Sequence, residues 1–380
     1  MASETTQVNH TIFTPNLYIA FELSNAEWKL GFTVGLGQAP RLRNLAARDM
    51  AGLREEIRLS KVRFSLPESA PVISCYEAGR DGFWLHRCLT AQGITNLVVD
   101  SASIEVNRRK RRAKTDRLDA GKLLLMLIRY VQGERKVWSV LHPPSPQEED
   151  QRQLHRELMT LKRERTHHIN RIKGLLISQG VSLALKADFL PQLEAVRLWD
   201  GTPLLPGLRQ SLLREYQRYQ LVQEQVHQIE LERREAIRTG DTLAIRQVRH
   251  LLQLKGVGVN SAWLYVMEFF SWRGFRNRRE LGSLSGLTPT PYQSGNRAHE
   301  QGISKAGNRP IRAMAIELAW CWLRFQPGSA LSIWYQNRFA HGNSRLRRIG
   351  IVALARKLLI ALWQYLERGL LPAGACLRTP

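Results

Sequence analysis

The chain has 380 residues, with 56 lysines and arginines against 33 aspartates and glutamates, a net charge of +23 and a pI near 10.6. Its 43% of hydrophobic residues excludes a disordered basic tail, and its length favours two or three domains. This surplus of positive charge predicts a polyanionic partner, most simply a nucleic acid, because each neutralised phosphate releases counterions. A membrane surface is the weaker alternative.

Targeting and redox signals are weak in this sequence. The segment "MASETTQVNHTIFTPN" lacks the basic and apolar regions of a signal peptide, and Arg356 and Lys357 interrupt the apolar run at 349–366. We therefore expect a cytoplasmic, nucleoid-associated protein with no membrane partner. The cysteines form no CxxC pair, which predicts reduced thiols without a zinc site or a disulfide framework. They are Cys75, Cys88, Cys321 and Cys376.

The N-terminal third alternates strand and helix patterns. Short apolar runs rich in β-branched and aromatic residues predict strands at 17–23, 28–34, 71–78 and 94–100. Helices are predicted at about 49–62, 81–92 and 116–132. This order predicts an α/β domain over residues 16–135, whose sheet combines an antiparallel edge with parallel inner strands.

A proline-rich break at 141–150 is followed by acids typical of a helix start, so we predict the domain linker there. Two apolar seams then repeat every three to four residues, from Leu154 to Leu175 and from Leu212 to Ile229. They predict a long antiparallel coiled-coil hairpin, within an oligomerisation region at 147–245. His167 and His168 lie in the first seam without a third ligand, which is typical of surface or core residues rather than metal ligands.

The last part is predicted to be mainly helical, with a C-terminal domain at 246–345 and a final helix and tail at 346–380. Gly256 and Gly258 separate two helical patterns as in a helix-hairpin-helix, whose turn offers backbone N–H groups to phosphate. Residues 285–312 are rich in Gly, Ser and Pro and predict a long irregular loop, typical of a functional one. Four tryptophans at helical positions are expected in the core, with stacking on nucleobases as the alternative. They are Trp320, Trp322, Trp334 and Trp363.

Four acids occupy positions that a sheet of this order brings together. Glu22 and Glu77 end two strands predicted to be neighbours, and Asp116 and Asp119 share one face at the start of a helix. Converging carboxylates repel one another unless cations neutralise them, and Mg²⁺ prefers such oxygen ligands. Taken alone, the aspartate pair is equally typical of an ordinary helix start, where the dipole favours acids.

The segment before these aspartates, "NRRKRRAK", is strongly basic. We predict that it binds the nucleic-acid backbone, although a solvated face or a localisation-type patch has the same composition. The net charge of the whole chain favours the first interpretation. The residues concerned are Arg108, Arg109, Lys110, Arg111, Arg112 and Lys114.

Several segments of the sequence resemble blocks of a known family. The blocks "YIAFELS...WKLGF", "CYEAGRDGFWL" and "RRAKTDRLDAGKL" are similar to the RuvC-like, RNase H-fold domain of the DEDD insertion-sequence transposases, the bridge-RNA-guided recombinases. "LKGVGVNSAWLYVMEF", "LSGLTP" and "YQSGNRAHEQGISKAGNRPIRAMAIELAW" are similar to the C-terminal transposase domain of that family. The blocks recur in order over about residues 17–340, and KTDRLDA and SG–GxISKxGNxxxR are the most specific.

The resemblance implies that Glu22, Glu77, Asp116 and Asp119 form the catalytic acid set and hold Mg²⁺. Glu22 departs from the family, which usually has Asp at this position. Glutamate keeps the charge and reaches one methylene further, so we expect the metal spacing to shift while ligation is retained.

The resemblance also implies a serine nucleophile that forms a covalent phosphoserine link to DNA. Ser294 in "QSGNR" matches the motif, with Ser304 and Ser285 as alternatives. Without the family, a serine in such a loop is most simply a turn former. The residues implied to bind the scissile phosphate region are Lys305, Asn308, Arg309 and Arg312.

The implied function is that of a recombinase that excises and inserts a mobile element. Its partners would be DNA at the element ends and the target, a structured guide RNA that selects sites by base pairing, and further copies of itself in a dimer or tetramer. One alternative is a Holliday-junction-type, Mg²⁺-dependent endonuclease in which water attacks. Another is a non-catalytic, basic nucleic-acid-binding protein.

Overall fold

The structure is a computed structural model that describes residues 15–104, 116–294 and 297–378; the side chains of residues 102, 116–119 and 293–300 lie outside the description. Two compact units divide the chain between Pro144 and Ser145. The extents of the four predicted regions stay predictions.

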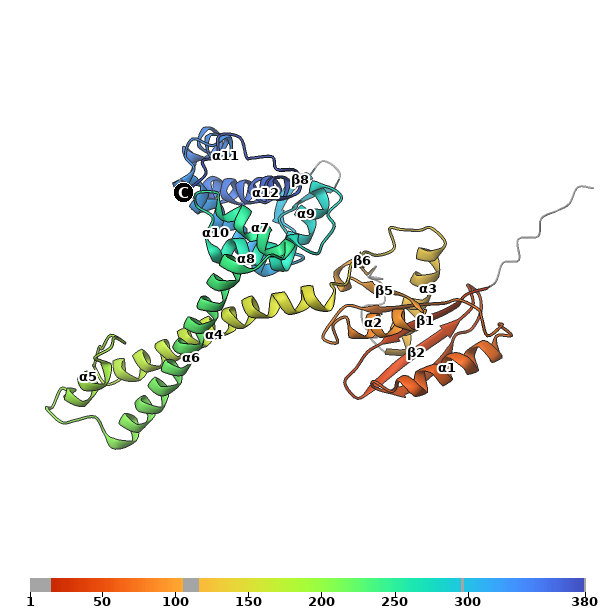
Figure 1. The fold of residues 1–380 in the computed structure, drawn as a ribbon, viewed down its shortest axis with the longest axis horizontal. Helices are drawn as coiled ribbons and strands as arrows, with labels where there is room; N and C mark the ends of the chain where they lie inside the picture. Colours follow the sequence, from red (N-terminus) through yellow and green to blue (C-terminus); the bar gives the residue numbers. More distant parts are fainter. Residues whose placement is uncertain (1–14, 105–115, 295–296, 379–380) are drawn as a thin grey trace, which may run out of the picture. The chain divides into compact units, whose positions relative to one another are not determined.

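The first unit contains a six-stranded mixed sheet in the order β3-β2-β1-β4-β5-β6 (Figure 1). Its elements are β1 (Leu17–Glu22), β2 (Glu27–Thr33), β3 (Arg41–Ala46), α1 (Met50–Arg63), β4 (Val72–Glu77), α2 (Trp84–Ala91), β5 (Thr95–Val99), a 3₁₀ turn η1 (Ser101–Ser103), α3 (Asp116–Val131) and β6 (Val140–Leu141). Strands β1, β4 and β5 run parallel, whereas β2, β3 and β6 join by antiparallel pairs. The predicted α/β sheet with an antiparallel edge is confirmed, and the two-residue β6 was missed.

Helices cover both faces of this sheet. On one face, Leu53 of α1 and Leu89 of α2 pack with Ile19 and Leu30 of the strands. On the other face, α3 packs against β1 and β4, with Leu127 buried in the same cluster as Val99. Each inner strand is therefore buried on both sides, which explains its nearly continuous apolar sequence.

The second unit starts with a long helix whose first turn is fixed by a capping box. Its helices and strands are α4 (Pro146–Ile177), α5 (Phe189–Ala195), α6 (Pro206–Thr239), α7 (Leu243–Leu252), α8 (Val259–Tyr265), η3 (Val266–Phe270), α9 (Arg278–Ser285), β7 (Pro289–Ser294), β8 (Arg297–Ile303), α10 (Arg309–Phe325), α11 (Ala330–Tyr335), η4 (Gln336–Ala340) and α12 (Ser344–Arg368). Ser145 Oγ accepts from the backbone of Glu148, whose carboxylate accepts from the backbone of Ser145. The elements η3 and η4 are single-turn π-helices.

Helices α4 and α6 pack against each other as an antiparallel arm. Leu158 lies with Val226, while Ile172 near the end of α4 lies with Leu212 near the start of α6. Between these apolar clusters the seam is polar: the buried Glu215 carboxylate contacts His168 Nδ1 at 2.7 Å and accepts from Arg218 at 2.8 Å. The two long helices are as predicted, and coiled-coil geometry stays a prediction.

At its other end the arm packs on η3 through charged groups, which are buried except for the half-exposed Arg156. Arg156 donates two hydrogen bonds to the buried Glu268, at 2.5 and 2.9 Å. Next to this pair, burial and the positive charge of Arg233 lower the pKa of His155 to about 4. Burial also lowers the pKa of Arg233 to about 10, and its guanidinium lies 4.9 Å from the ring centroid of Trp263.

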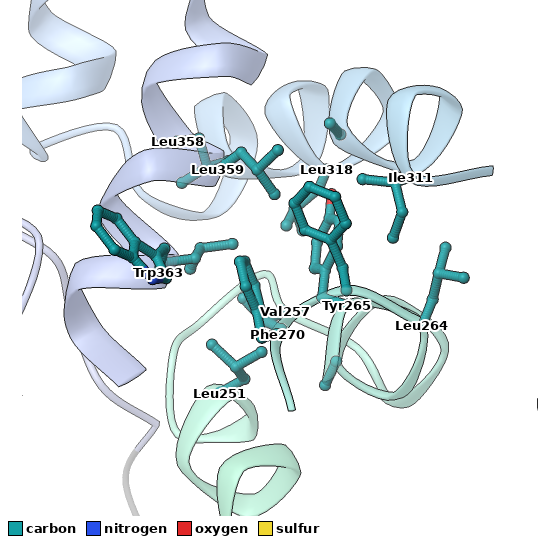
Figure 2. Close-up of a cluster of buried hydrophobic side chains, with 14 of the residues drawn as sticks. Leu251, Val257, Leu264, Tyr265, Phe270, Ile311, Leu318, Leu358, Leu359 and Trp363 are labelled. Carbon is teal, nitrogen blue, oxygen red and sulfur yellow. The ribbon is translucent and has the colours of Figure 1, made fainter. Parts of the chain in front are cut away.

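The C-terminal core is built from α7 to α12 (Figure 2), where Leu251, Phe270, Leu318 and Leu358 converge from four elements. By length and composition, α12 is the one helix of the described chain that could cross a membrane. Half of its most apolar window is buried inside the unit, as expected for a core helix.

Two predictions for this unit are wrong. Residues 289–303 form the antiparallel hairpin β7–β8, where an irregular loop was expected. Trp322 and Trp363 are buried as predicted and Trp334 is partly buried against the core, but Trp320 is 50% exposed on α10.

A short tail closes the core after α12. Gln326 is buried, and its amide donates to the carbonyl oxygens of Lys255 and Cys376 and accepts from the Cys376 backbone. Arg378 donates to the carbonyl of Val257, in the turn between α7 and α8. Helices α7 and α8 flank the turn at Gly256 and Gly258, and the tail occupies several of the backbone groups there. The helix-hairpin-helix stays a prediction.

Candidate functional site

Two of the predicted acids lie at one edge of the sheet. Strands β1 and β4 are parallel neighbours, and the last of their aligned pairs is Phe21 with Tyr76. Glu22 and Glu77 follow this pair directly, so both carboxylates lie at the C-terminal edge on adjacent strands. Glu22 is partly buried and Glu77 is exposed, which leaves one side of the pair open to solvent.

Both glutamates belong to the face of the sheet that α3 covers. Tyr18 and Ala20 of β1, and Cys75 of β4, are buried in the cluster formed with α3. Because side chains alternate along a strand, Glu22 follows Ala20 and Glu77 follows Cys75 on that same face. Burial raises the pKa of the Cys75 thiol, which keeps it a neutral packing group beside the acids.

Helix α3 lies over the centre of the same two strands. The Cys75 thiol contacts the Leu123 carbonyl at 4.0 Å, and a Cβ at Gly31 of β2 would lie 2.7 Å from Leu124 Cδ1. Asp116 and Asp119 form the first turn of this helix, but their side chains lie outside the described residues. The structure therefore places Glu22 and Glu77 on adjacent strands at one edge of the sheet. That Asp116 and Asp119 complete the acid set stays a prediction.

The donor set fits a hard divalent cation. Two adjacent carboxylates offer only oxygen ligands, as Mg²⁺ prefers, and one of them faces solvent. Within the described side chains, no group of three or more His, Cys, Asp or Glu is arranged to hold a metal. The side chains of Asp116 and Asp119 lie outside the described ones, so a complete metal site depends on these two residues.

The predicted basic run lies outside the described residues, between η1 and α3. It comprises Arg108, Arg109, Lys110, Arg111, Arg112 and Lys114. These residues precede Asp116 in the chain by a few positions.

Ser294 is the last residue of β7, at the far end of the hairpin. Its backbone pairs with Arg297, and the base of the hairpin is the bond from Ser304 N to the Thr288 carbonyl at 2.9 Å. Five residue steps separate Pro289 from Ser294, which is about 17 Å at the rise of an antiparallel strand. The side chain of Ser294 lies outside the described residues.

The base of the hairpin is a compact junction of two loops. The backbone of Lys305 donates to Gly286, and that of Asn308 donates to Leu284. Gly286 has φ +68° and Gly307 φ +85°, and a Cβ on either would collide with a carbonyl oxygen of the facing loop. Lys305 has a left-handed φ of +57°, a strained conformation for a residue other than glycine.

The four residues predicted to bind phosphate divide into two pairs at this junction. The side chain of Asn308 caps α10 by accepting from Ile311 N at 3.0 Å, and Arg312 lies 3.4 Å from the carbonyls of Ser285 and Ala306. These two side chains hold the loops together. Lys305 and Arg309 are exposed and remain available for an anion.

The alternative serines differ in accessibility. Ser285 is fully buried, and its hydroxyl donates to the Gly282 carbonyl at 2.9 Å. Ser304 is exposed at the base of the hairpin, directly beside Lys305. The junction of positive side chains therefore adjoins Ser304, whereas Ser294 lies at the opposite end of the hairpin.

Sequence reasoning missed Arg356 of α12. A Cβ at Gly282 would lie 3.1 Å from Arg356 Nε and 3.5 Å from Thr288 Oγ1. Both of these atoms are buried, and neither has a hydrogen-bond partner within the described residues. The only signal was the pair Arg356–Lys357 inside an apolar helical run, a pattern that indicates a polar partner but does not identify it.

With this geometry in place, comparison with known proteins identifies the class. Residues 248–335 match the family described as "Transposase IS116/IS110/IS902 family". A protein of Sinorhizobium fredii named "Putative transposase y4rJ" is 41% identical over 377 residues, which covers 96% of this chain and 95% of the relative. The transposase of the insertion sequence element IS1328 from Yersinia enterocolitica is 27% identical over 235 residues, covering 60% of this chain and 67% of the relative.

A third relative, the transposase of the element IS1111A from Coxiella burnetii, is 27% identical over 211 residues, or 55% of this chain and 56% of the relative. The class is therefore that of insertion-sequence transposases. The chain belongs to the IS116/IS110/IS902 family of transposases.

Proposed function

We propose that this transposase cleaves and rejoins DNA strands in an RNase H-like, RuvC-like centre formed by Glu22, Glu77, Asp116 and Asp119. The observation that carries the proposal is the position of Glu22 and Glu77, at the ends of adjacent parallel strands and on the face that α3 covers. Carboxylates gathered at one sheet edge are a usual way to hold divalent cations for phosphoryl transfer.

Mg²⁺ bound by these oxygens would stabilise the negative charge that develops on the attacked phosphate. The chain would supply the carboxylates, their fixed spacing on the sheet and the Ser294 nucleophile. In this step Ser294 Oγ loses its proton, forms a bond to phosphorus and displaces the oxygen of the neighbouring nucleotide, leaving a phosphoserine link. Attack by the freed hydroxyl of another strand would reverse the link and join the strands.

The proposed nucleophile and the proposed metal site come from different units of the chain. Ser294 stands at the end of a two-stranded hairpin, about 17 Å from the junction at its base, a form suited to reaching into another copy. We therefore propose a dimer or tetramer in which the acids of one copy meet Ser294 of another.

The positive charge of the chain supports nucleic acids as its partners. The run from Arg108 to Lys114, together with Lys305 and Arg309, would bind phosphates of DNA and of a structured guide RNA. The RNA would select element ends and target by base pairing, so that the protein reads mainly backbone shape and charge. A protein with these partners would work in the cytoplasm, at the nucleoid.

The test is strand exchange on DNA carrying the element ends, with the non-coding RNA transcribed from the element. Glu22→Gln removes one metal-binding charge without changing side-chain size, and Ser294→Ala removes only the hydroxyl. Each change is expected to abolish exchange, a loss of about 10³-fold or more, while nucleic-acid binding stays near the wild-type level. The matched control Ser304→Ala is expected to stay active.

A second candidate is a Holliday-junction-type nuclease in which water attacks. It is favoured by the distance between Ser294 and the cationic junction, which leaves Lys305 and Arg309 out of reach of a phosphate at Ser294 in the same copy. A covalent protein–DNA adduct on denaturing gels, lost in Ser294→Ala, would support the serine mechanism. Metal-dependent cleavage without any adduct would support the water mechanism, and no cleavage at all would leave a binding protein.

A further inference from the structure

The chain contains a long segment without any acid. No aspartate or glutamate occurs between Glu317 and Glu367, a stretch that includes the end of α10, α11, η4 and most of α12. Its cations are Arg324, Arg338, Arg345, Arg347, Arg348, Arg356 and Lys357. No charge within this stretch can neutralise them, so their counterions must come from elsewhere.

Four of these arginines lie on two elements that are packed together. Phe339 of η4 packs against Gly350 of α12, and the Tyr335 hydroxyl donates to the carbonyl of Arg347 at 3.4 Å. Only the turn at 341–343 joins η4 to α12. Arg338, Arg345, Arg347 and Arg348 therefore all lie around the junction of η4 and α12, and together they are called the C-terminal basic face.

In the part of the chain that the structure describes, the guanidinium groups of this face have no ion-pair or hydrogen-bond partner. Residues 343–349 are all exposed, as is Arg338. Among the described residues, no ion pair or side-chain hydrogen bond involves these four arginines. By contrast, Arg209 and Arg238 of α6 each contact a glutamate, at 3.0 and 2.7 Å.

The apolar side chains of α12 pack mainly into the C-terminal core. Leu354, Leu358 and Leu362 are almost fully buried in the C-terminal core, so this helix has no free apolar face to insert into a lipid surface. In its first turns α12 presents mainly arginines to solvent, with the two exposed apolar residues Leu346 and Ile349 between them. This composition favours a phosphate backbone over a membrane.

We propose that the C-terminal basic face binds the phosphodiester backbone of a nucleic acid. Unpaired guanidinium groups bind phosphate in a bidentate manner without first giving up a protein partner. Arg345 and Arg348, one helical turn apart, would contact phosphates of one strand. The face begins after residue 335, where the family match ends, and the proposal rests on the proposed function only in assuming a nucleic-acid partner.

The experiment compares two charge-matched double variants of the full-length protein. Arg345→Ala with Arg348→Ala removes two unpaired arginines, whereas Arg58→Ala with Arg238→Ala removes two exposed arginines that pair with Glu55 and Glu235. Binding is measured over a salt series to a short DNA duplex, to an RNA hairpin and to vesicles of phosphatidylserine and phosphatidylcholine.

The face variant is expected to lose roughly tenfold in affinity for DNA, for RNA or for both, with a salt dependence shallower by about one to two units. The probe that weakens identifies the source of the phosphates, and Arg345→Lys with Arg348→Lys should restore most of the affinity. The control variant should keep the wild-type affinity and slope.

Equal losses in the two variants would overturn the proposal, because they would reflect net charge alone. Unchanged binding in the face variant would overturn it too, as would a loss confined to vesicles. Binding is measured without strand exchange, so a protein that binds through this face but never cleaves DNA would contradict the proposed function and leave the face intact.

Discussion

Helix α6 and helix α12 both carry arginines at short intervals, but the groups around those arginines differ. In α6, Arg218 contacts the buried Glu215 and Arg238 contacts Glu235 one turn away. In α12, Arg345, Arg347 and Arg348 follow one another in a segment without acids. Arginines thus form ion pairs within the arm, whereas the arginines of the C-terminal basic face are left for a ligand. Net charge alone does not separate the two uses.

This comparison predicts that an arm arginine affects stability where its partner carboxylate is buried, and that the arginines of the C-terminal basic face affect binding. The largest effect is expected for Arg156→Ala, which leaves the buried Glu268 carboxylate without its bidentate partner. The free energy of unfolding should fall by roughly 2–4 kcal/mol, measured by denaturant titration. Adding Glu268→Gln should recover part of the loss. A change below about 1 kcal/mol would mean that the pair does not hold the arm to η3.

A second prediction concerns pH at the same place. The native pKa of His155, about 4, lies below its ordinary value of 6.5, because burial and the neighbouring Arg233 disfavour the charged ring. The unfolded chain therefore binds the proton first, and the stability present above pH 6.5 is lost as the pH falls towards 4. By pH 4.5 this residue should cost about 2–3 kcal/mol.

The measurement is the unfolding free energy at pH 7 and at pH 4.5 for the wild type and for His155→Gln. The loss between the two pH values should be smaller in the variant by that amount. Parallel pH profiles for the two proteins would show that the His155 ring is solvated or already charged in the native state.

The smallest effect is expected for Arg238→Ala, whose partner Glu235 is exposed and one turn away. Exposed pairs of this kind contribute little, so the melting temperature should not change measurably. The face variant Arg345→Ala with Arg348→Ala should also melt like the wild type, because those side chains contact no acid. A clear loss of thermal stability in the face variant would mean that its arginines are structural and would remove the contrast with the arm.

Sequence patterns predicted the local elements well and the distant contacts poorly. The strand ending in Glu22, the strand ending in Glu77 and the helix starting at Asp116 were predicted within a residue or two, because strand alternation and helix starts are local signals. The same patterns predicted that the first two are neighbours, since the order of strands and helices limits the possible sheets.

The missed features depend on partners that are far away in sequence. Arg156 and Glu268 are separated by 112 positions, so no periodic pattern links them. Sequence patterns missed the hairpin β7–β8 because Pro289 and Pro291 in β7 and Gly302 in β8 gave its strands a loop-like composition. Trp320 fits an apolar helical pattern and is exposed all the same, because nothing in a single helix says whether a neighbour covers that side.

The tail around Cys376 has a practical consequence. Gln326 and Val257 are satisfied by backbone and side-chain groups that arrive from the final residues of the described chain. A shortened protein that stops after α12 would keep every helix and would still expose a buried amide and the edge at Leu254, which pairs with Leu377. Truncation after α12 to aid crystallisation would therefore expose part of the core instead of removing a dispensable tail.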